Sequence, residues 1–384
     1  MNIAQVIPTY LPAVRYGGPI NAVHDLCRHL VARGHRVEVF TTNVDGPDRT
    51  AWKPARVTNL DGVAVHYFPV RAPRRLYYSP EMAEALRERV VEFDLLHLHS
   101  AFLYPTLKAS RCAARRQVPY VISPRGMLVE DLIRRKNYLL KSAWITLFER
   151  RTIEQASAVH VTSELEAREL RRFGFALPKV FEAANGLEFP AIDETAPKEP
   201  DTILFLGRLD WKKGIERLIA ALSALKGATL VVAGNDESGY TLKLEELCTR
   251  LGVRERVEFI GRVEGRDKWR LYRRASVFVL PSLSENLANT VLEAMAMECP
   301  VVVTPEVGLA GLVERHGAGI VSAGDPLNLA GAIGKILDDP ERALEMGRKG
   351  RVLVKERFAW KDVAATMERA YAEVIAAHVR QAVA

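Results

Sequence analysis

Short apolar runs alternate with longer stretches of helical spacing along the first half of the chain. Residues 3–7 form an apolar run, and residues 20–33 carry apolar side chains three or four positions apart, which is the spacing of one helix face. Further apolar runs, each expected to be a strand, lie at residues 37–40, 95–98, 120–122 and 159–161. Strands that alternate with helices predict a parallel sheet covered by helices on both faces.

The pattern stops at residues 187–201 and then starts again. This stretch holds three prolines and little apolar periodicity, so we interpret it as a linker. Strands are expected beyond it at residues 202–206, 229–233, 257–260, 277–280 and 300–303, with a helix at 215–225 and an amphipathic helix at 360–379. The prediction is an α/β protein with domains at 1–190 and 191–360, followed by a C-terminal helix, 361–384. Ligands bind beyond the carboxyl ends of strands in such sheets, so we expect a site in a cleft between the domains.

Composition and charge narrow the range of partners. The chain has 384 residues, of which 48% are hydrophobic and 26% charged, as expected for a globular protein of about two domains. The net charge of +7 comes from residues 1–190, with basic segments at 71–75, 111–116 and 134–136. Anionic lipid, nucleic acid or a phosphorylated substrate could bind there. We do not expect nucleic acid, because there is no recognition motif and the charges are not interleaved with aromatic residues.

Targeting signals and cysteine usage indicate the compartment. No run of about 18 apolar residues is present, and the first residues do not form a signal peptide. Cys27, Cys112, Cys248 and Cys299 have neither zinc-binding nor redox spacing. They are best interpreted as buried thiols in a reducing environment, so we expect a cytoplasmic protein.

The segment Gly207–Gly214 follows one predicted strand and leads into a predicted helix. Arg208 lies where the strand ends and Lys213 where the helix begins, so the two can converge on one anion. A guanidinium binds phosphate oxygens in pairs, an ammonium adds a point charge, and the helix N-terminus is itself positive. The segment is not a P-loop. It is a candidate phosphate-binding loop, and the alternative is that both cations are solvated loop charges.

A second segment, residues 282–296, follows the strand expected at 277–280. Glu285 is expected in a loop and Glu293 about two turns into the next helix. Two carboxylates can accept hydrogen bonds from sugar hydroxyls without a metal, and backbone N–H groups near Asn289 and Thr290 suit a phosphate. The alternative is an N-cap for Glu285 and an exposed position for Glu293. The apolar neighbours of Glu293 weigh against an exposed position.

A third feature is the glycine pair Gly17-Gly18 in the loop after the first strand. Glycine lets the backbone approach a ligand closely, although a plain tight turn is an equally simple explanation. The segment Gly317-Ala318-Gly319 lacks the last glycine and the preceding strand of a dinucleotide fingerprint, so we set it aside.

The first two segments, in this order and about 70 residues apart, resemble those of a known family. Retaining glycosyltransferases of the GT-B fold, family 4, carry G-R-x-x-x-x-K-G followed by S-x-S-E-x7-E in a C-terminal nucleotide-binding domain. Both patterns are intact here. The similarity extends to Gly17-Gly18, to L-x-x-x-G-H-x-V at residues 30–37, to Asn185-Gly186 and to Phe358–Trp360 at the start of the last helix.

The resemblance implies two Rossmann-like domains that face one another across a cleft, and sugar transfer from a UDP- or GDP-sugar with retention at the anomeric carbon. Arg208 and Lys213 would hold the diphosphate and stabilise its charge as it leaves. Glu285 would bind the donor sugar and Glu293 the ribose. The leaving phosphate would act as the base, and neither a metal nor another cofactor is expected. The implied donor-binding residues are Gly17, Gly18, Arg208, Lys213, Gly261, Arg262, Glu285, Leu287, Ala288, Asn289, Thr290 and Glu293.

Two departures from the family pattern concern the site. The family often has Gly-Phe-Gly after the first glutamate, whereas this chain has Asn286-Leu287-Ala288, which reduces backbone freedom. Many members also have a His-Gly near the donor sugar. Arg125 takes that place here, as in a subgroup that resembles exopolysaccharide and lipopolysaccharide transferases. His99, at the end of the preceding strand, is the other candidate for this role, or else a core histidine. The implied catalytic residues are Arg208, Lys213, Glu285, Arg125 and His99.

The N-terminal domain is expected to bind the acceptor, a glycan or a lipid-linked sugar of cell-surface polysaccharide biosynthesis. Residues 132–151 combine basic and large apolar side chains, so they can lie on an anionic membrane at the inner face of the plasma membrane. A helix packed on the core is the alternative. A different function is also compatible with the altered motifs, namely an inactive nucleotide-sugar-binding partner subunit. The motif pair argues against an epimerase or a phosphorylase.

Overall fold

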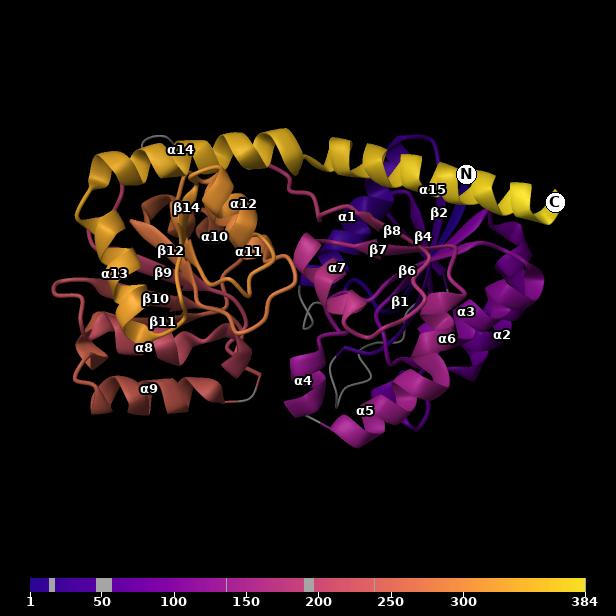
Figure 1. The fold of residues 1–384 in the computed structure, drawn as a ribbon, viewed down its shortest axis with the longest axis horizontal. Helices are drawn as coiled ribbons and strands as arrows, with labels where there is room; N and C mark the ends of the chain where they lie inside the picture. The colour runs from indigo at the N-terminus through magenta and orange to yellow at the C-terminus, as the bar shows by residue number, and fades with distance from the viewer. Residues whose placement is uncertain (14–17, 46–56, 136, 190–196, 238, 384) are drawn as a thin grey trace. The chain divides into compact units, whose positions relative to one another are not determined.

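The computed structural model describes residues 1–13, 18–45, 57–135, 137–189, 197–237 and 239–383. The chain forms two compact units, of which the first comprises residues 1–186 and 360–384 and the second residues 187–359. Each unit has its own sheet (Figure 1).

The first unit contains an eight-stranded sheet in the order β3-β4-β2-β1-β5-β6-β7-β8. Its strands are β1 (Asn2–Thr9), β2 (Arg36–Thr42), β3 (Val57–Leu60), β4 (Val63–Phe68), β5 (Leu95–His99), β6 (Tyr120–Ser123), β7 (Ala158–Val161) and β8 (Lys179–Glu182). All neighbours are parallel except β3 and β4, which form an antiparallel pair at one edge. The central strands β1, β5, β6 and β7 are buried along nearly their whole length, as expected for a sheet covered on both faces.

Helices cover both faces of the first sheet. They are α1 (Gly18–Ala32), α2 (Pro80–Arg89), α3 (Tyr104–Arg116), α4 (Glu130–Arg135), α5 (Tyr138–Trp144), the π-helical turn η3 (Ile145–Glu149), α6 (Arg150–Glu154), α7 (Glu164–Arg171) and the last helix, α15 (Trp360–Val383). One apolar cluster joins the sheet to α1 and α15, which lie against each other (Figure 1). A second cluster joins it to α2, α3 and α7.

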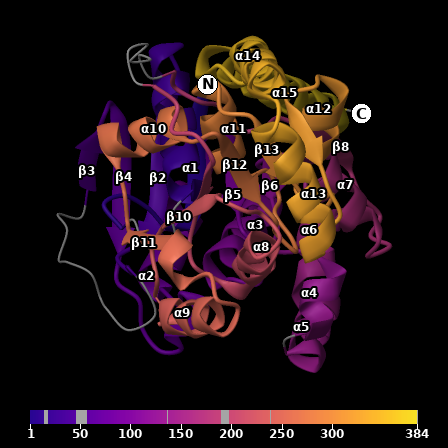
Figure 2. The same cartoon turned by 90° about the vertical axis from the view of Figure 1, so that its left-hand side faces the viewer.

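The second unit contains a six-stranded parallel sheet in the order β11-β10-β9-β12-β13-β14. Its strands are β9 (Thr202–Leu206), β10 (Thr229–Ala233), β11 (Val257–Gly261), β12 (Val277–Leu280), β13 (Val301–Val303) and β14 (Gly319–Val321). Its helices are α8 (Ile215–Leu222), α9 (Tyr240–Arg250), α10 (Gly265–Arg274), α11 (Asn289–Ala296), α12 (Ala310–Arg315), α13 (Pro326–Leu337) and α14 (Pro340–Arg357). Helix α8 packs against α9 and α13, whereas α11 packs against α10 and α14 (Figure 2).

The predicted α/β class with two Rossmann-like sheets is confirmed, and every strand expected from an apolar run is present. The sequence pattern missed β3, β4, β8 and β14. Most positions in these strands are half-buried or exposed, so they lack the continuous apolar run that marks a central strand. In the described part of the chain, no helix is both long enough and apolar enough to cross a membrane.

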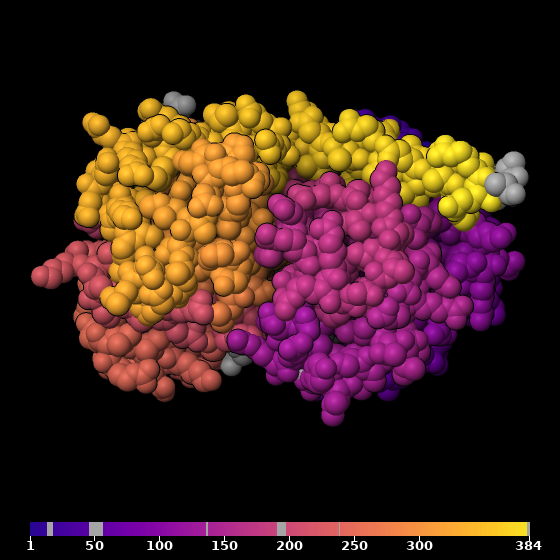
Figure 3. Space-filling view, viewed as in Figure 1, coloured from indigo at the N-terminus to yellow at the C-terminus, as the bar shows by residue number. Residues whose placement is uncertain are grey.

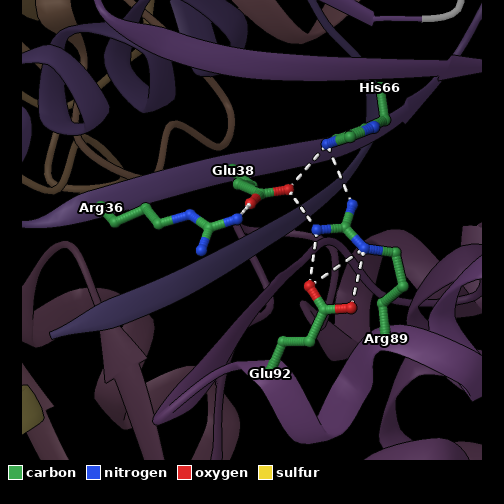
Figure 4. Close-up of polar contacts among 5 residues, drawn as sticks. All are labelled: Arg36, Glu38, His66, Arg89 and Glu92. Atoms are coloured by element: carbon green, nitrogen blue, oxygen red, sulfur yellow. Dashed lines mark hydrogen bonds and ion pairs between the residues drawn. The ribbon is translucent and has the colours of Figure 1, made fainter.

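A buried ion cluster joins β2, β4 and α2 in the first unit (Figure 4). The side chain of Glu38 is 4% exposed, and its Oε2 lies 2.7 Å from Nε2 of His66 and 2.9 Å from a terminal nitrogen of Arg89. Its other oxygen accepts a hydrogen bond from Arg36 at 2.5 Å, and Arg89 also pairs with Glu92 at 2.8 Å. Because the buried carboxylate has three partners, we interpret this cluster as structural.

Candidate functional site

The loop after β9 is built around Gly214. Asp210 caps the short helix at 211–213 by accepting a hydrogen bond from the Lys212 N–H at 3.0 Å. Gly214 follows at φ 67°, and a Cβ atom there would lie 2.1 Å from the carbonyl oxygen of Pro281. Only glycine therefore allows this loop to pack against the end of β12. The backbone oxygen of Lys212 also accepts a hydrogen bond from Leu283 N–H at 2.7 Å, so the two sequence segments lie in contact.

Lys213 and Glu285 are joined directly, although 72 positions separate them in the sequence. The ammonium of Lys213 donates a hydrogen bond to the Glu285 carboxylate, and the two side chains are only 17% and 22% exposed. The backbone of Glu285 is fixed by hydrogen bonds with Glu306 and Gly308, at 3.0 and 2.9 Å. Arg208, in the same loop as Lys213, is exposed and has no ion pair with any described residue.

Glu293 lies on α11, where it is held by two residues of α10. Its Oε1 lies 2.8 Å from the ammonium of Lys268, and its Oε2 accepts a hydrogen bond from the Tyr272 hydroxyl at 2.9 Å. Its side chain is 15% exposed, so the alternative of an exposed helix residue is wrong. Burial raises the pKa of Tyr272, and the negative charge of Glu293 raises it further. The tyrosine therefore stays protonated and donates to the carboxylate.

The expectation that Glu293 lies two turns into its helix is wrong. Helix α11 begins at Asn289, so Glu293 is its fifth residue, just over one turn from the N-terminus. The preceding residue, Ala288, has the left-handed conformation at φ 74°. It occupies the position of a glycine in the family pattern, and the chain adopts the glycine-like conformation without the glycine. Leu287 and Ala288 are buried, while Asn289 and Thr290 are half-buried at the start of the helix.

The order of the strands brings the candidate donor-binding residues to one edge of the second sheet. Arg208 follows β9, Gly261 ends β11 and Ser282 follows β12, and parallel neighbours present their carboxyl ends at the same edge. Gly261 accepts a hydrogen bond from the Gly234 N–H at 2.8 Å. Arg262 pairs with Glu264 in an exposed ion pair.

In the first unit, Arg125 and His99 are neighbours. Arg125 follows β6 and has φ 55°, and two of its nitrogens lie 3.3 and 3.4 Å from Nδ1 of His99, at the end of β5. Its third nitrogen donates to Oδ1 of Asn185 at 2.9 Å. His99 is 1% exposed, so it is a core histidine that contacts Arg125. Gly18 is the first residue of α1, whereas Gly17 lies outside the described residues.

Arg125 has no carboxylate partner in the part of the chain that the structure describes. The nearby Glu166 accepts hydrogen bonds from the backbone N–H groups of Gly126 and Thr162, at 2.7 and 2.8 Å. Burial lowers the pKa of Arg125, and the charge of Glu166 partly offsets this. A guanidinium stays protonated even so, which leaves a half-buried cation with neutral partners.

A directed chain of hydrogen bonds runs from Arg125 to α15. Because Arg125 can only donate, His99 accepts at Nδ1 and donates from Nε2 to Gln5 at 2.7 Å. The amide of Gln5 then donates to the Tyr371 hydroxyl at 3.4 Å, and this hydroxyl donates to Nδ1 of His97 at 2.7 Å. The sequence had given no sign that Tyr371 belongs to this cluster.

The chain continues beyond His97 to the backbone. Nε2 of His97 donates to Ser123, whose hydroxyl donates to His160, both at 2.6 Å, and His160 donates to the Ala183 carbonyl at 2.8 Å. These tautomers are assigned from the network. Burial lowers the pKa of all three histidines, that of His160 to about 3, and Arg125 lowers each further. All three are therefore neutral at physiological pH.

Among the described residues, no group of three or more His, Cys, Asp or Glu side chains could hold a metal ion. The site on the second unit is built from a Lys–Glu pair, an exposed arginine and a supported glutamate. These groups can bind phosphate and hydroxyl groups without a metal.

Comparison with known proteins gives the family. Residues 17–186 match a model described as "Glycosyl transferase 4-like domain", and residues 191–353 match "Glycosyl transferases group 1". An uncharacterized glycosyltransferase of Methanocaldococcus jannaschii is 30% identical, over 95% of this chain and 96% of its own. A glycogen synthase of Mycobacterium tuberculosis is 29% identical, over 97% and 94%. Sucrose-phosphate synthase from Thermosynechococcus elongatus has a similar fold, with a TM-score of 0.79 at 23% identity over 98% of this chain and 99% of that one.

The two Rossmann-like sheets and the two matched models define a glycosyltransferase of the GT-B fold. The chain belongs to the group 1 glycosyl transferases of family 4.

Proposed function

We propose that the protein transfers a sugar from a UDP- or GDP-sugar to a glycan or lipid-linked acceptor, with retention at the anomeric carbon. The observation that carries this proposal is the contact between Lys213 and Glu285 at the edge of the second sheet, with Arg208 exposed in the same loop. A cation and a carboxylate held together suit a substrate that carries phosphates beside hydroxyl groups.

Each charged group then has a role in the donor complex. Arg208 and Lys213 bind the diphosphate and stabilise the negative charge that grows on it as the glycosidic bond breaks. Glu285 accepts hydrogen bonds from the sugar hydroxyls, and Glu293 accepts them from the ribose. Lys268 and Tyr272 hold Glu293 in place, so they are positioning residues. The leaving phosphate takes the proton of the acceptor hydroxyl.

Arg125 is our choice for the substrate-binding residue of the first unit. It keeps its charge among neutral partners, so it can pair with an anionic group of a substrate. His99 is too buried to reach a substrate, and we assign it to positioning Arg125. The expectation for Gly18 is a backbone contact to phosphate, and this stays part of the proposal.

The acceptor belongs to cell-surface polysaccharide biosynthesis in this proposal. Relatives are named as a glycogen synthase and as D-inositol 3-phosphate glycosyltransferases, so relatives of this chain act on more than one kind of acceptor. The four cysteines are free thiols and three are buried, which is typical of a reducing compartment. We place the reaction at the inner face of the plasma membrane, with residues 132–151 contacting anionic lipid.

Thermal unfolding with a panel of nucleotides and nucleotide sugars tests the donor. A ligand that binds only the native state raises stability by RT ln(1 + [L]/Kd), so a UDP- or GDP-sugar should raise the Tm. NMR of donor hydrolysis should then show retention. No Tm shift with any nucleotide would overturn the proposal. A shift without hydrolysis or transfer would favour the inactive partner subunit.

A further inference from the structure

A basic groove lies between α2 and α3 of the first unit, apart from every residue assigned above. It has a volume of about 680 Å³. Its charged lining consists of Glu84 and Arg87 from α2, and Lys108, Arg111, Arg115 and Arg116 from α3. Five cations therefore face a single carboxylate.

Helical spacing explains why these cations share one face. Lys108, Arg111 and Arg115 are three or four positions apart, so they form one stripe along α3. Like charges at this spacing repel each other and destabilise an isolated helix by a few tenths of a kcal/mol per pair. The cost is offset when an anion binds across the stripe.

The cations of the groove are not neutralised within the protein. Arg87 lies 3.2 Å from Glu84 in an exposed pair of the same helix, which is a weak interaction. Arg115 and Arg116 form no ion pair with any residue that the structure describes. Lys108 and Arg111 lie over the rings of Tyr104 and Phe148, at 5.3 and 5.5 Å, which leaves their charge in place.

The charges of these residues also act on Cys112, which lines the groove. Burial raises the pKa of this thiol, while Lys108, Arg115, Arg87 and Arg116 all lower it. The lining of the groove is therefore strongly positive, which suits a ligand with phosphate groups.

Exposed apolar side chains lie on α5 and η3 of the same unit. A second hollow of about 220 Å³ shares Arg111 and Arg115 with it, and is lined on its other side by Leu147 and Phe148 of η3. Leu147 is 65% exposed, and Leu139 and Leu140 on the preceding α5 are 82% and 71% exposed. The purple stretch that carries them stands open to solvent at the lower edge of the first unit (Figure 3). Soluble surfaces rarely gather such leucines without a partner.

We propose that the groove between α2 and α3 binds the phosphate headgroups of an anionic lipid surface, while Leu139, Leu140 and Leu147 enter its apolar layer. Cations beside exposed leucines are the composition of an interfacial membrane site. The proposal rests on the membrane contact in the proposed function, and it adds the chemistry of the lipid and the cations that bind it. Lipid binding needs no donor, so it can succeed where the transferase proposal fails.

Co-sedimentation of the whole chain with vesicles tests the site. We expect binding to an equal mixture of phosphatidylcholine and phosphatidylglycerol, weakening as salt is added, and little binding to phosphatidylcholine alone. Each basic residue near an anionic surface is worth about 1 kcal/mol, so R111Q/R115Q should weaken binding roughly 30-fold. The matched control is R342Q/R348Q, which removes two exposed arginines of α14 and should bind as the unmodified protein does.

Two further measurements separate the alternatives. L139S/L147S should weaken vesicle binding while leaving the salt dependence intact, because it removes only the apolar contribution. Titration with inorganic phosphate and diphosphate tests a soluble ligand. The lipid assignment would be overturned if these ions bind saturably, R111Q/R115Q abolishes that binding, and the unmodified protein is not retained on anionic vesicles. Equal vesicle binding by R111Q/R115Q and the unmodified protein would overturn the site itself. The Tm shift with nucleotide sugars should be the same in all these variants.

Discussion

The hydroxyl of Tyr371 lies 2.7 Å from Nδ1 of His97, and it joins the last helix of the chain to the fifth strand across 274 positions of sequence. The same hydroxyl accepts a hydrogen bond from Gln5, whose amide oxygen accepts one from His99, the neighbour of Arg125. Helix α15 therefore contributes to holding Arg125, although it lies far from that residue in the sequence.

Tyr371→Phe should lower both stability and activity. Loss of a buried hydrogen bond costs about 1–3 kcal/mol, and the released network holds Arg125 less firmly. Tyr120→Phe is the matched control, because it removes the hydrogen bond of another buried tyrosine, to the Thr152 carbonyl at 2.7 Å. Unfolding curves should show similar destabilisation in both variants. Measurements of kcat and KM should show a loss of kcat in Tyr371→Phe only. Equal kinetic losses in both variants would contradict the positioning role.

Arg208→Ala should reduce transfer roughly 10²–10³-fold, which is the usual cost of losing a group that stabilises a developing negative charge. Its unfolding curve should be unchanged, because Arg208 is exposed. The control is Lys212→Ala, which removes an ammonium that lies 6.0 Å from the centre of the Trp211 ring. A loss of only a few-fold in initial rate for Arg208→Ala would rule out the assigned role.

Glu293→Ala should raise the donor Kd more than it lowers kcat, because the ribose is bound equally in the ground state and the transition state. Tyr272→Phe should give a smaller change in the same direction, since Lys268 still holds the carboxylate. Glu246→Ala removes an exposed carboxylate from α9 and serves as the control. Calorimetric titration with the nucleotide measures the Kd, and an unchanged value in Glu293→Ala would refute the ribose assignment.

Ala288→Gly should stabilise the protein by about 1 kcal/mol. The left-handed conformation at position 288 costs an L-residue roughly 1–2 kcal/mol, and glycine avoids this cost. The larger backbone entropy that glycine loses on folding offsets part of this gain. Ala343→Gly, inside α14, should have the opposite sign and cost about 1 kcal/mol. Denaturant unfolding of the two variants checks the contrast. A loss of stability in Ala288→Gly would contradict this expectation.

Glu38→Gln should destabilise the first unit by about 1–3 kcal/mol, because it removes the charge that pairs with His66 and Arg89, while Arg89 keeps its ion pair with Glu92. Burial by itself raises the pKa of Glu38, but His66, Arg89 and Arg36 together hold it below its ordinary value of 4.5. The carboxylate therefore contributes stability above that value, and the contribution is lost as the pH falls below 4.5 towards the native pKa. Unfolding curves recorded as the pH is lowered should show this loss in the unmodified protein and a smaller one in Glu38→Gln. Identical pH profiles would contradict the role of Glu38.

Much of the fold could be predicted from local pattern. Continuous apolar runs identified the central strands, and the break in periodicity at residues 187–201 predicted a linker between the two α/β stretches. The half-exposed edge strands β3, β8 and β14 were missed, because nothing in a short mixed run distinguishes a strand from a loop. The pairing of Lys213 with Glu285 was not predicted, because 72 positions separate the two residues in the sequence.

The sequence by itself determined the α/β class, the central strands and the residue types available for phosphate and sugar. These depend on periodicity and on side-chain chemistry, which are properties of short segments. Only the tertiary structure decided that Lys268 and Tyr272 hold Glu293, that Tyr371 belongs to the Arg125 network, and that the arginines of α3 line an open groove. Such contacts depend on how helices pack on a sheet, and packing brings together residues whose separation in the chain carries no signal.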